Sequence, residues 1–211
     1  MRGVHKPDTM HFSPEEIRDL IKAWIAISLA VSIAILGFDA LSVLGLPLLV
    51  RAVVIYALTV GIAFLAHEVF GHKFVSQRYG LFAEFRADDL FLMLAVLLSF
   101  TGFVFAAPGA VVISGTTRID TYGKIAAAGP LVNIILATFF LMLSFAGLQL
   151  VLPLYGGQGI DLISTGYQIN SWLALFNLLP LGILDGAKVM AWSKPAWLTL
   201  IATAGALLFI L

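Results

Sequence analysis

The sequence predicts an all-α polytopic membrane protein with a small β element, built from about five membrane helices plus a re-entrant segment. Of its 211 residues, 61% are hydrophobic and only 11% are charged, whereas ~25% of the residues of a soluble domain are charged. Several apolar runs reach the ~20 residues that a helix needs to cross a bilayer. This chain has too little polar surface to cover a water-soluble globule. We therefore expect residues 1–211 to form one domain embedded in a lipid bilayer.

Two further features of the composition limit the chemistry. The chain contains no cysteine, so a bound metal must be held by histidine, aspartate or glutamate. The formal net charge is zero, which gives no indication of a nucleic-acid partner.

The first two membrane helices are predicted from an N-terminal signal and a turn. Residues 1–16 are largely polar, and Ser13-Pro14-Glu15-Glu16 has the pattern of a capped helix start. The following run is apolar up to Gly37 and is expected to remain as an anchor. A turn at residues 44–47 separates it from a second span, which runs from Pro47 to Arg78.

Shorter segments follow the second span. In the region 81–120, residues 82–86 alternate like a strand, residues 90–107 are apolar, and residues 109–114 are strand-like. The remaining chain divides into these predicted elements: a turn at 115–117, a helix at 121–150, a Gly- and Pro-containing loop at 151–165, a helix at 166–179 and a last apolar segment at 197–211.

The distribution of positive charge decides whether residues 90–107 cross the membrane. If this segment re-enters, eleven of the twelve cations lie on one side and only Arg51 lies on the other, as the positive-inside rule requires. The eleven are Arg2, Lys6, Arg18, Lys22, Lys73, Arg78, Arg86, Arg118, Lys124, Lys188 and Lys194. If the segment spans, the division falls to seven against five. We therefore expect a re-entrant segment and a cytoplasmic N-terminus in the cell membrane.

The residues that indicate a chemical function lie inside the second span. His67, Glu68 and His72 interrupt an apolar stretch that runs from Leu46 to Val75, and ionisable groups at that depth indicate a functional site. The cluster is nearly the H-E-x-x-H signature of a zinc protease, with one extra residue between the histidines. A hydrolytic zinc site needs three protein ligands, an open position for water and a base.

The spacing of the two histidines has a structural consequence. Residues five apart lie ~140° apart on an ideal α-helix, so His67 and His72 cannot bind one ion in that geometry. A single-turn π-bulge would return them to one face, and Gly71 makes such a distortion easier. Glu68 and His72 are four apart and share a face without a bulge, so they form the alternative ligand pair.

A third ligand must come from elsewhere in the chain. Asp120 and Asp161 lie in turns on either side of the third helix, and Asp185 follows a helix that breaks at Pro180. Under the re-entrant topology, Asp185 and the histidines lie near the same face of the membrane. Under the spanning topology, Asp185 would lie at the opposite face, so the ligand argument and the charge argument agree.

Three ordered motifs resemble those of a known family. Residues 67–72 look like its H-E-x-G-H element with one insertion, residues 129–133 look like its G-P-x-x-N element, and residues 177–186 look like its N-x-x-P…D-G element. The chain thereby resembles the site-2 protease family of intramembrane zinc metalloproteases, in its compact prokaryotic form. The resemblance extends over most of the chain.

The resemblance implies a role for each site residue. His67, His72 and Asp185 would be ligands of Zn²⁺, Glu68 the general base, and Asn177 a polar partner of the substrate or of the developing oxyanion. The resemblance also implies that a strand pairs with an unwound substrate helix. That strand consists of Gly109, Ala110, Val111, Val112, Ile113 and Ser114.

The expected function is therefore that of a zinc endopeptidase that cleaves transmembrane helices of other proteins. Two alternatives stay open. The insertion between the histidines is compatible with a relative that has lost catalysis. The same polar cluster is also compatible with a transporter or a proton relay. Asn133 and Gly129-Pro130 are expected to serve packing and kinking, since small residues let membrane helices approach closely.

Overall fold

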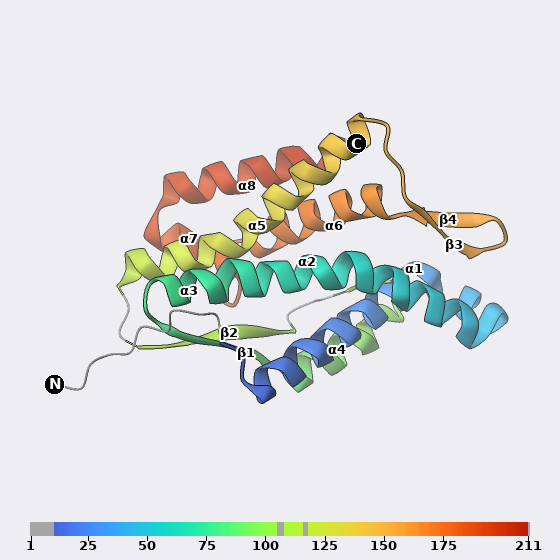
Figure 1. Ribbon diagram of the computed structural model, residues 1–211, viewed down its shortest axis with the longest axis horizontal. Helices are drawn as coiled ribbons and strands as arrows, with labels where there is room; N and C mark the ends of the chain where they lie inside the picture. The colour runs from blue at the N-terminus through green and yellow to red at the C-terminus, as the bar shows by residue number, and fades with distance from the viewer. Residues whose placement is uncertain (1–10, 105–107, 116–117, 211) are drawn as a thin grey trace.

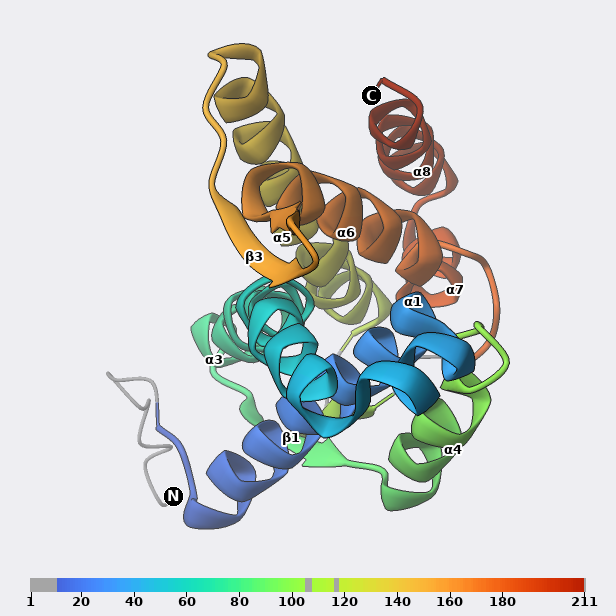
Figure 2. The ribbon, with the colours of Figure 1, turned by 90° about the vertical axis from the view of Figure 1, so that its right-hand side faces the viewer.

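The molecule is a helical assembly around one long central helical segment (Figure 1). The computed structural model describes residues 11–104, 108–115 and 118–210. On one side of the central segment lie the later helices, and on the other lie the first helix, a short helix and a two-stranded sheet (Figures 1 and 2). Two clusters of buried apolar side chains, one on each side, hold these layers together.

The first helix begins where the capping pattern predicts. α1 (Pro14–Tyr56) has Ser13 as its N-cap, and the Glu16 amide donates to Ser13 Oγ at 3.1 Å. The chain leaves helical geometry at Gly37 and at Gly45, where φ is +73° and +66°. These breaks separate a first arm, which ends at Gly37, from a second arm, which starts at Gly45, and the second break lies in the predicted turn. The first ten residues of the predicted N-terminal segment are outside the described part of the chain.

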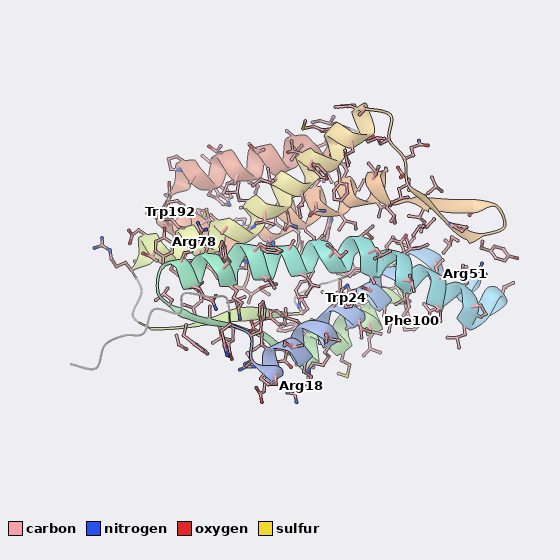
Figure 3. All side chains as sticks on the ribbon, viewed as in Figure 1. Arg18, Trp24, Arg51, Arg78, Phe100 and Trp192 are labelled. Atoms are coloured by element: carbon pink, nitrogen blue, oxygen red, sulfur yellow. The ribbon has the colours of Figure 1, made fainter. Side chains whose placement is uncertain are left out.

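The second arm continues into the central segment without interruption. It runs through η1 (Ala57–Gly61), α2 (Ile62–Leu65), η2 (Ala66–Lys73) and α3 (Phe74–Arg78), where η denotes π-helix. Trp24 of the first arm packs against η1, and its indole N–H donates to the Ala57 carbonyl at 2.9 Å (Figure 3). Gly61 permits this contact, because a Cβ there would lie 2.0 Å from the indole ring.

After α3, the chain forms a strand, then a short helix, then a second strand that pairs with the first. β1 (Phe82–Ala87) pairs antiparallel with β2 (Gly109–Ser114), and Ala87 at the end of β1 faces Gly109 at the start of β2. Between them, α4 (Asp89–Ser99) has 11 residues, a length of ~16 Å against the ~30 Å of a hydrocarbon core. α4 is therefore shorter than a membrane-crossing helix, and the strands on either side of it lie next to each other. Residues 105–107 of the predicted segment are not described.

After β2, the described residues form four helices and a hairpin. The four helices cover the side of the central segment that faces away from the first arm of α1 (Figure 1). They are α5 (Ile119–Phe145), α6 (Leu162–Asn177), α7 (Asp185–Trp192) and α8 (Lys194–Leu208). The predicted loop at 151–165 was wrong, because β3 (Val151–Tyr155) and β4 (Gln158–Asp161) pair there as a hairpin. Gly156 and Gly157 have φ of +58° and +82°, which is the turn geometry that suits a tight hairpin.

The expectation of about five membrane helices was also wrong in its count. Within the described residues, three helices are long and apolar enough to cross a membrane: Pro14–Gly37, Gly45–Arg78 and Ile119–Phe145. α6 and α8 have 16 and 15 residues, so each extends only ~22–24 Å. The predicted ranges 166–179 and 197–211 already had 14 and 15 residues and a break at Pro180, so the count was too high because both were included among the membrane helices.

Candidate metal centre

A π-helix brings the two histidines together. η2 covers residues 66–73, and the Phe74 amide at its end donates to the Val69 carbonyl five residues earlier. As a result, Nε2 of His67 and Nε2 of His72 lie 3.0 Å apart. The predicted distortion between the histidines is confirmed. The alternative pair of Glu68 with His72 is not the one that the helix brings together.

Asp185 completes a group of three possible ligands. Its Oδ2 lies 3.3 Å from His67 Nε2 and 3.0 Å from His72 Nε2, and the three ligand atoms lie within 4.8 Å of one another. The three residues are 4–7% exposed. The other two candidate acids serve elsewhere, since Asp120 pairs with Arg118 at 3.1 Å and Asp161 caps α6.

The second ring nitrogen of each histidine is held by α5. His72 Nδ1–H donates to the Ile125 carbonyl at 3.0 Å, and His67 Nδ1 lies 2.5 Å from Asn133 Oδ1. Asn133 Nδ2 in turn donates to Asn170 Oδ1 at 2.9 Å. Because Nδ1 of each ring acts as the donor, Nε2 is left with its lone pair toward the shared position.

Sequence reasoning treated Asn133 as a packing residue and so missed this contact. The signal was present in the motif at residues 129–133, which places the asparagine one helical turn after Gly129-Pro130. On α5 that spacing puts the amide beside the histidines.

Two glycines keep the space at the histidines open. A Cβ on Gly129 would lie 2.4 Å from His72 Nε2 and 2.6 Å from His67 Nε2. A Cβ on Gly71 would lie 2.5 Å from the Gly129 Cα. The packing role expected of Gly129 is therefore confirmed, and its lack of a side chain leaves room where both ring nitrogens point.

Two ionisable side chains lie next to this group. Glu68 is buried, and its Oε2 has no hydrogen-bond partner among the described residues. Lys188 Nζ donates to Asp185 Oδ1 at 3.2 Å, so the two carboxylate oxygens of Asp185 face different partners. Sequence reasoning did not single out Lys188, although its position one helical turn after Asp185 predicts this contact on a helix.

The metal centre opens into a cavity of about 740 Å³. Its wall includes Glu68, both histidines, Asp185 and, from the opposite side, β2 from Gly109 to Ile113. Asn177 also lines the cavity, and its Nδ2 donates to the Leu173 carbonyl at 3.0 Å. The structure therefore places Asn177 in the same cavity as the ligands, but not in the hydrogen-bonded group around them. Ser114, at the end of the predicted strand, is exposed.

The donors present fit a zinc ion. Two imidazoles and one carboxylate are the ligand types and the number that a catalytic zinc site uses, with a fourth position open to water. Gly129 leaves the necessary space, and Glu68, whose Oε2 has no hydrogen-bond partner among the described residues, lines the same cavity. Zn²⁺ is accordingly the cofactor of this site.

Comparison with known proteins agrees with this assignment. The chain is 37% identical over 190 residues to a protein of Methanocaldococcus jannaschii whose name reads "Putative zinc metalloprotease", and the match covers 88% of each chain. No family model and no solved structure matches the chain.

Proposed function

Since the chain belongs to the family of that zinc metalloprotease, we propose that it is an intramembrane endopeptidase of the site-2 protease type, which cleaves transmembrane helices of other membrane proteins. The observation that carries this proposal is the position of the metal centre. His67 and His72 lie within the apolar helix Gly45–Arg78, so the reaction would take place at a depth where membrane helices are the available peptide substrates.

Each residue of the centre would have a defined task. Nε2 of His67, Nε2 of His72 and Oδ2 of Asp185 would hold Zn²⁺, which, when bound, lowers the pKa of its water toward ~7 and polarises the substrate carbonyl. Glu68 would accept a proton from the attacking water and deliver it to the amine of the broken peptide bond. Asn177 uses one of its two amide hydrogens on Leu173, which leaves the other for the substrate carbonyl oxygen.

The substrate would bind as an added strand. Among the strands that the structure describes, β2 pairs on one edge, with β1, and residues 109–113 line the cavity. The carbonyls of a substrate helix are hydrogen-bonded within that helix, so the segment must unwind before zinc can reach one of them. Pairing with β2 would compensate for the lost helical hydrogen bonds.

The proposed topology places the N-terminus in the cytoplasm of a multi-pass membrane protein. Arg51 lies at the end of the molecule that carries the β3–β4 hairpin, and Arg78 lies at the opposite end (Figure 3). Single cysteines replacing Gln77 and Thr116 should react with a membrane-impermeant reagent from the cytoplasmic side, and one replacing Gly157 from the other side. Labelling of the first two from opposite sides would contradict the re-entrant topology.

The test of function combines elemental analysis with proteolysis. Purified protein in liposomes should contain one zinc per chain and should cut a co-reconstituted single-span protein within its membrane segment. Glu68→Gln should retain zinc and leave the substrate intact. Zinc without cleavage would favour the relative that has lost catalysis, and protein without zinc would favour the transporter or relay.

A further inference from the structure

A fully buried ion pair beside the metal centre has no task in the mechanism above. Lys73 directly follows His72 in η2, and its ammonium donates to Glu16 Oε2 of α1. Both residues are 0% exposed, and the ammonium also lies 4.1 Å from the centre of the Phe12 ring. Burying two charges is unfavourable unless their remaining hydrogen-bonding capacity is used. The partners of Glu16 therefore indicate why the pair is present.

The other carboxylate oxygen of Glu16 binds the sheet. Its Oε1 accepts from the Phe85 amide of β1 at 2.9 Å. One helical turn further along α1, Asp19 Oδ2 accepts from the Ala87 amide at 3.3 Å. Two amides on the outer edge of β1 are thus capped by carboxylates, so that edge is closed to a further strand.

The register of the sheet carries this contact to β2. Phe85 faces Val111, and Ala87 faces Gly109. In an antiparallel pair, residues that face each other direct their backbone groups both inward or both outward. Because Phe85 directs its amide away from β2, Val111 directs its own away from β1, toward the free edge. Gly109 and Ile113 share this orientation, and all three line the cavity.

We propose that Lys73 and Glu16 are positioning residues that fix the substrate-binding edge of β2 relative to the metal centre. The path is short: His72 is followed by Lys73, which binds Glu16, which binds Phe85, which faces Val111. The ion pair of Lys73 with Glu16, called the bridge below, determines which peptide bond of a strand added to β2 lies at the zinc. This inference rests on the proposed function.

The main test variant removes the bridge without leaving a buried charge. In Glu16→Gln/Lys73→Met, both side chains keep their approximate length. The glutamine oxygen introduced on α1 can still accept from the Phe85 amide, but the link from α1 to η2 is lost. Replacement of a buried ion pair by neutral residues of similar size is often tolerated. Asp19→Asn is the matched control, because Asp19 binds β1 and otherwise pairs with Arg18 and Lys22 of its own helix.

The cleavage products of a single-span substrate in liposomes report on the bridge. The wild type and Asp19→Asn should cut mainly one bond. The double variant should keep one zinc per chain, lose roughly tenfold to a hundredfold in kcat/KM, and cut additional bonds two residues away, because a strand repeats every two residues. Unchanged cleavage positions with zinc retained would overturn the inference and leave the proposed function intact. A wild type that binds zinc and cuts nothing would refute both.

Two further measurements separate positioning from stability. Spin labels on cysteines replacing Arg78 and Ala110 should give a broader distance distribution in the double variant than in the wild type, whether or not substrate is present. The exchanged pair Glu16→Lys/Lys73→Glu restores opposite charges, but the ammonium that it introduces on α1 cannot accept from the Phe85 amide. It should therefore fail to restore single-bond cleavage. Restoration by the exchanged pair would show that the contact with Phe85 is not needed, and an unchanged distance distribution in the double variant would show that the ion pair does not position β2. Either result would overturn the inference.

Discussion

The two walls of the cavity differ in how many of their polar groups already have a partner. On the wall formed by η2, α5 and α7, each possible ligand is held by a second contact: His72 by Ile125, His67 by Asn133 and Asp185 by Lys188. On the wall formed by β2, one strand edge is paired and the other faces the cavity. The metal wall is preorganised, whereas under the proposed function the strand wall would be completed by the substrate chain. Substitutions on the two walls should therefore fail in different ways.

The largest effect is expected from removal of a ligand. His67→Ala, His72→Ala and Asp185→Ala should each abolish stoichiometric zinc and all cleavage, because two remaining donors do not make a catalytic zinc site. Elemental analysis of each purified variant measures this. A variant with full zinc content would remove that residue from the ligand set.

Glu68→Gln is expected to separate metal binding from catalysis. The amide keeps the shape of the side chain but cannot accept the proton, so cleavage should fall by ~10²–10⁴-fold with zinc content unchanged. Loss of zinc in this variant, together with its retention in His67→Ala, would instead support Glu68 and His72 as the ligand pair.

Loss of the contact between Asn133 of α5 and His67 should weaken zinc binding without abolishing it. Asn133→Ala removes the acceptor beside His67 Nδ1 and should weaken zinc binding by ~10–100-fold, the usual effect of losing such a partner. Competition with a chelator of known affinity measures the change. Asn177 lines the same cavity and binds the Leu173 carbonyl, so Asn177→Ala should keep the zinc affinity of the wild type. Equal weakening in both variants would argue against a specific role for Asn133.

Substitutions in β2 should weaken substrate binding and leave the zinc content unchanged. Val111→Pro removes an amide that points to the free edge of β2, where proline is tolerated. One lost hydrogen bond of ~0.5–1.5 kcal/mol should raise KM by roughly twofold to tenfold, with one zinc per chain retained. Val111→Ala shortens the same side chain but keeps the amide and serves as the control. A similar rise in KM for both variants would attribute the effect to the side chain.

The smallest effect is expected from substitution of Asp161, which lies outside both walls of the cavity. Asp161 caps α6, and slight burial raises the pKa of its carboxyl, but hydrogen bonds from the Leu150, Ser164 and Ile163 amides outweigh this and lower it overall. Asp161→Ala should cost ~1 kcal/mol of stability at neutral pH, with zinc content and KM unchanged. Because the folded-state pKa is lowered, the contribution is present above the ordinary value of 3.8 and is lost as pH falls further. Thermal unfolding at pH 7 and below pH 3.8 tests both points.

Local features of the fold could be predicted from the sequence. The cap at Ser13, the strand at residues 82–86 and the distortion between His67 and His72 each depend on a few neighbouring residues, and all three are present. The hairpin at residues 151–161 was missed because its Gly and Pro content is equally typical of a loop. The count of about five membrane helices was too high because it included the segments at 166–179 and 197–211 on their apolar composition, although each is shorter than the ~20 residues that a span needs.

The sequence by itself determined the class of the protein and the chemistry of its centre. A cysteine-free apolar chain with two histidines and a glutamate inside a membrane-length helix leaves few ligands to choose from, and the five-residue spacing requires a π-helix.

The resemblance named Asp185, but only the tertiary structure showed that this acid lies beside the histidines and what surrounds them. Asp185 lies 118 residues from His67, Asn133 lies 66 residues from it, and Glu16 lies 57 residues from Lys73. Contacts over such separations depend on how helices pack and how a strand registers with its neighbour. Periodicity along the chain records which face of an element is buried, but not which residue it meets there.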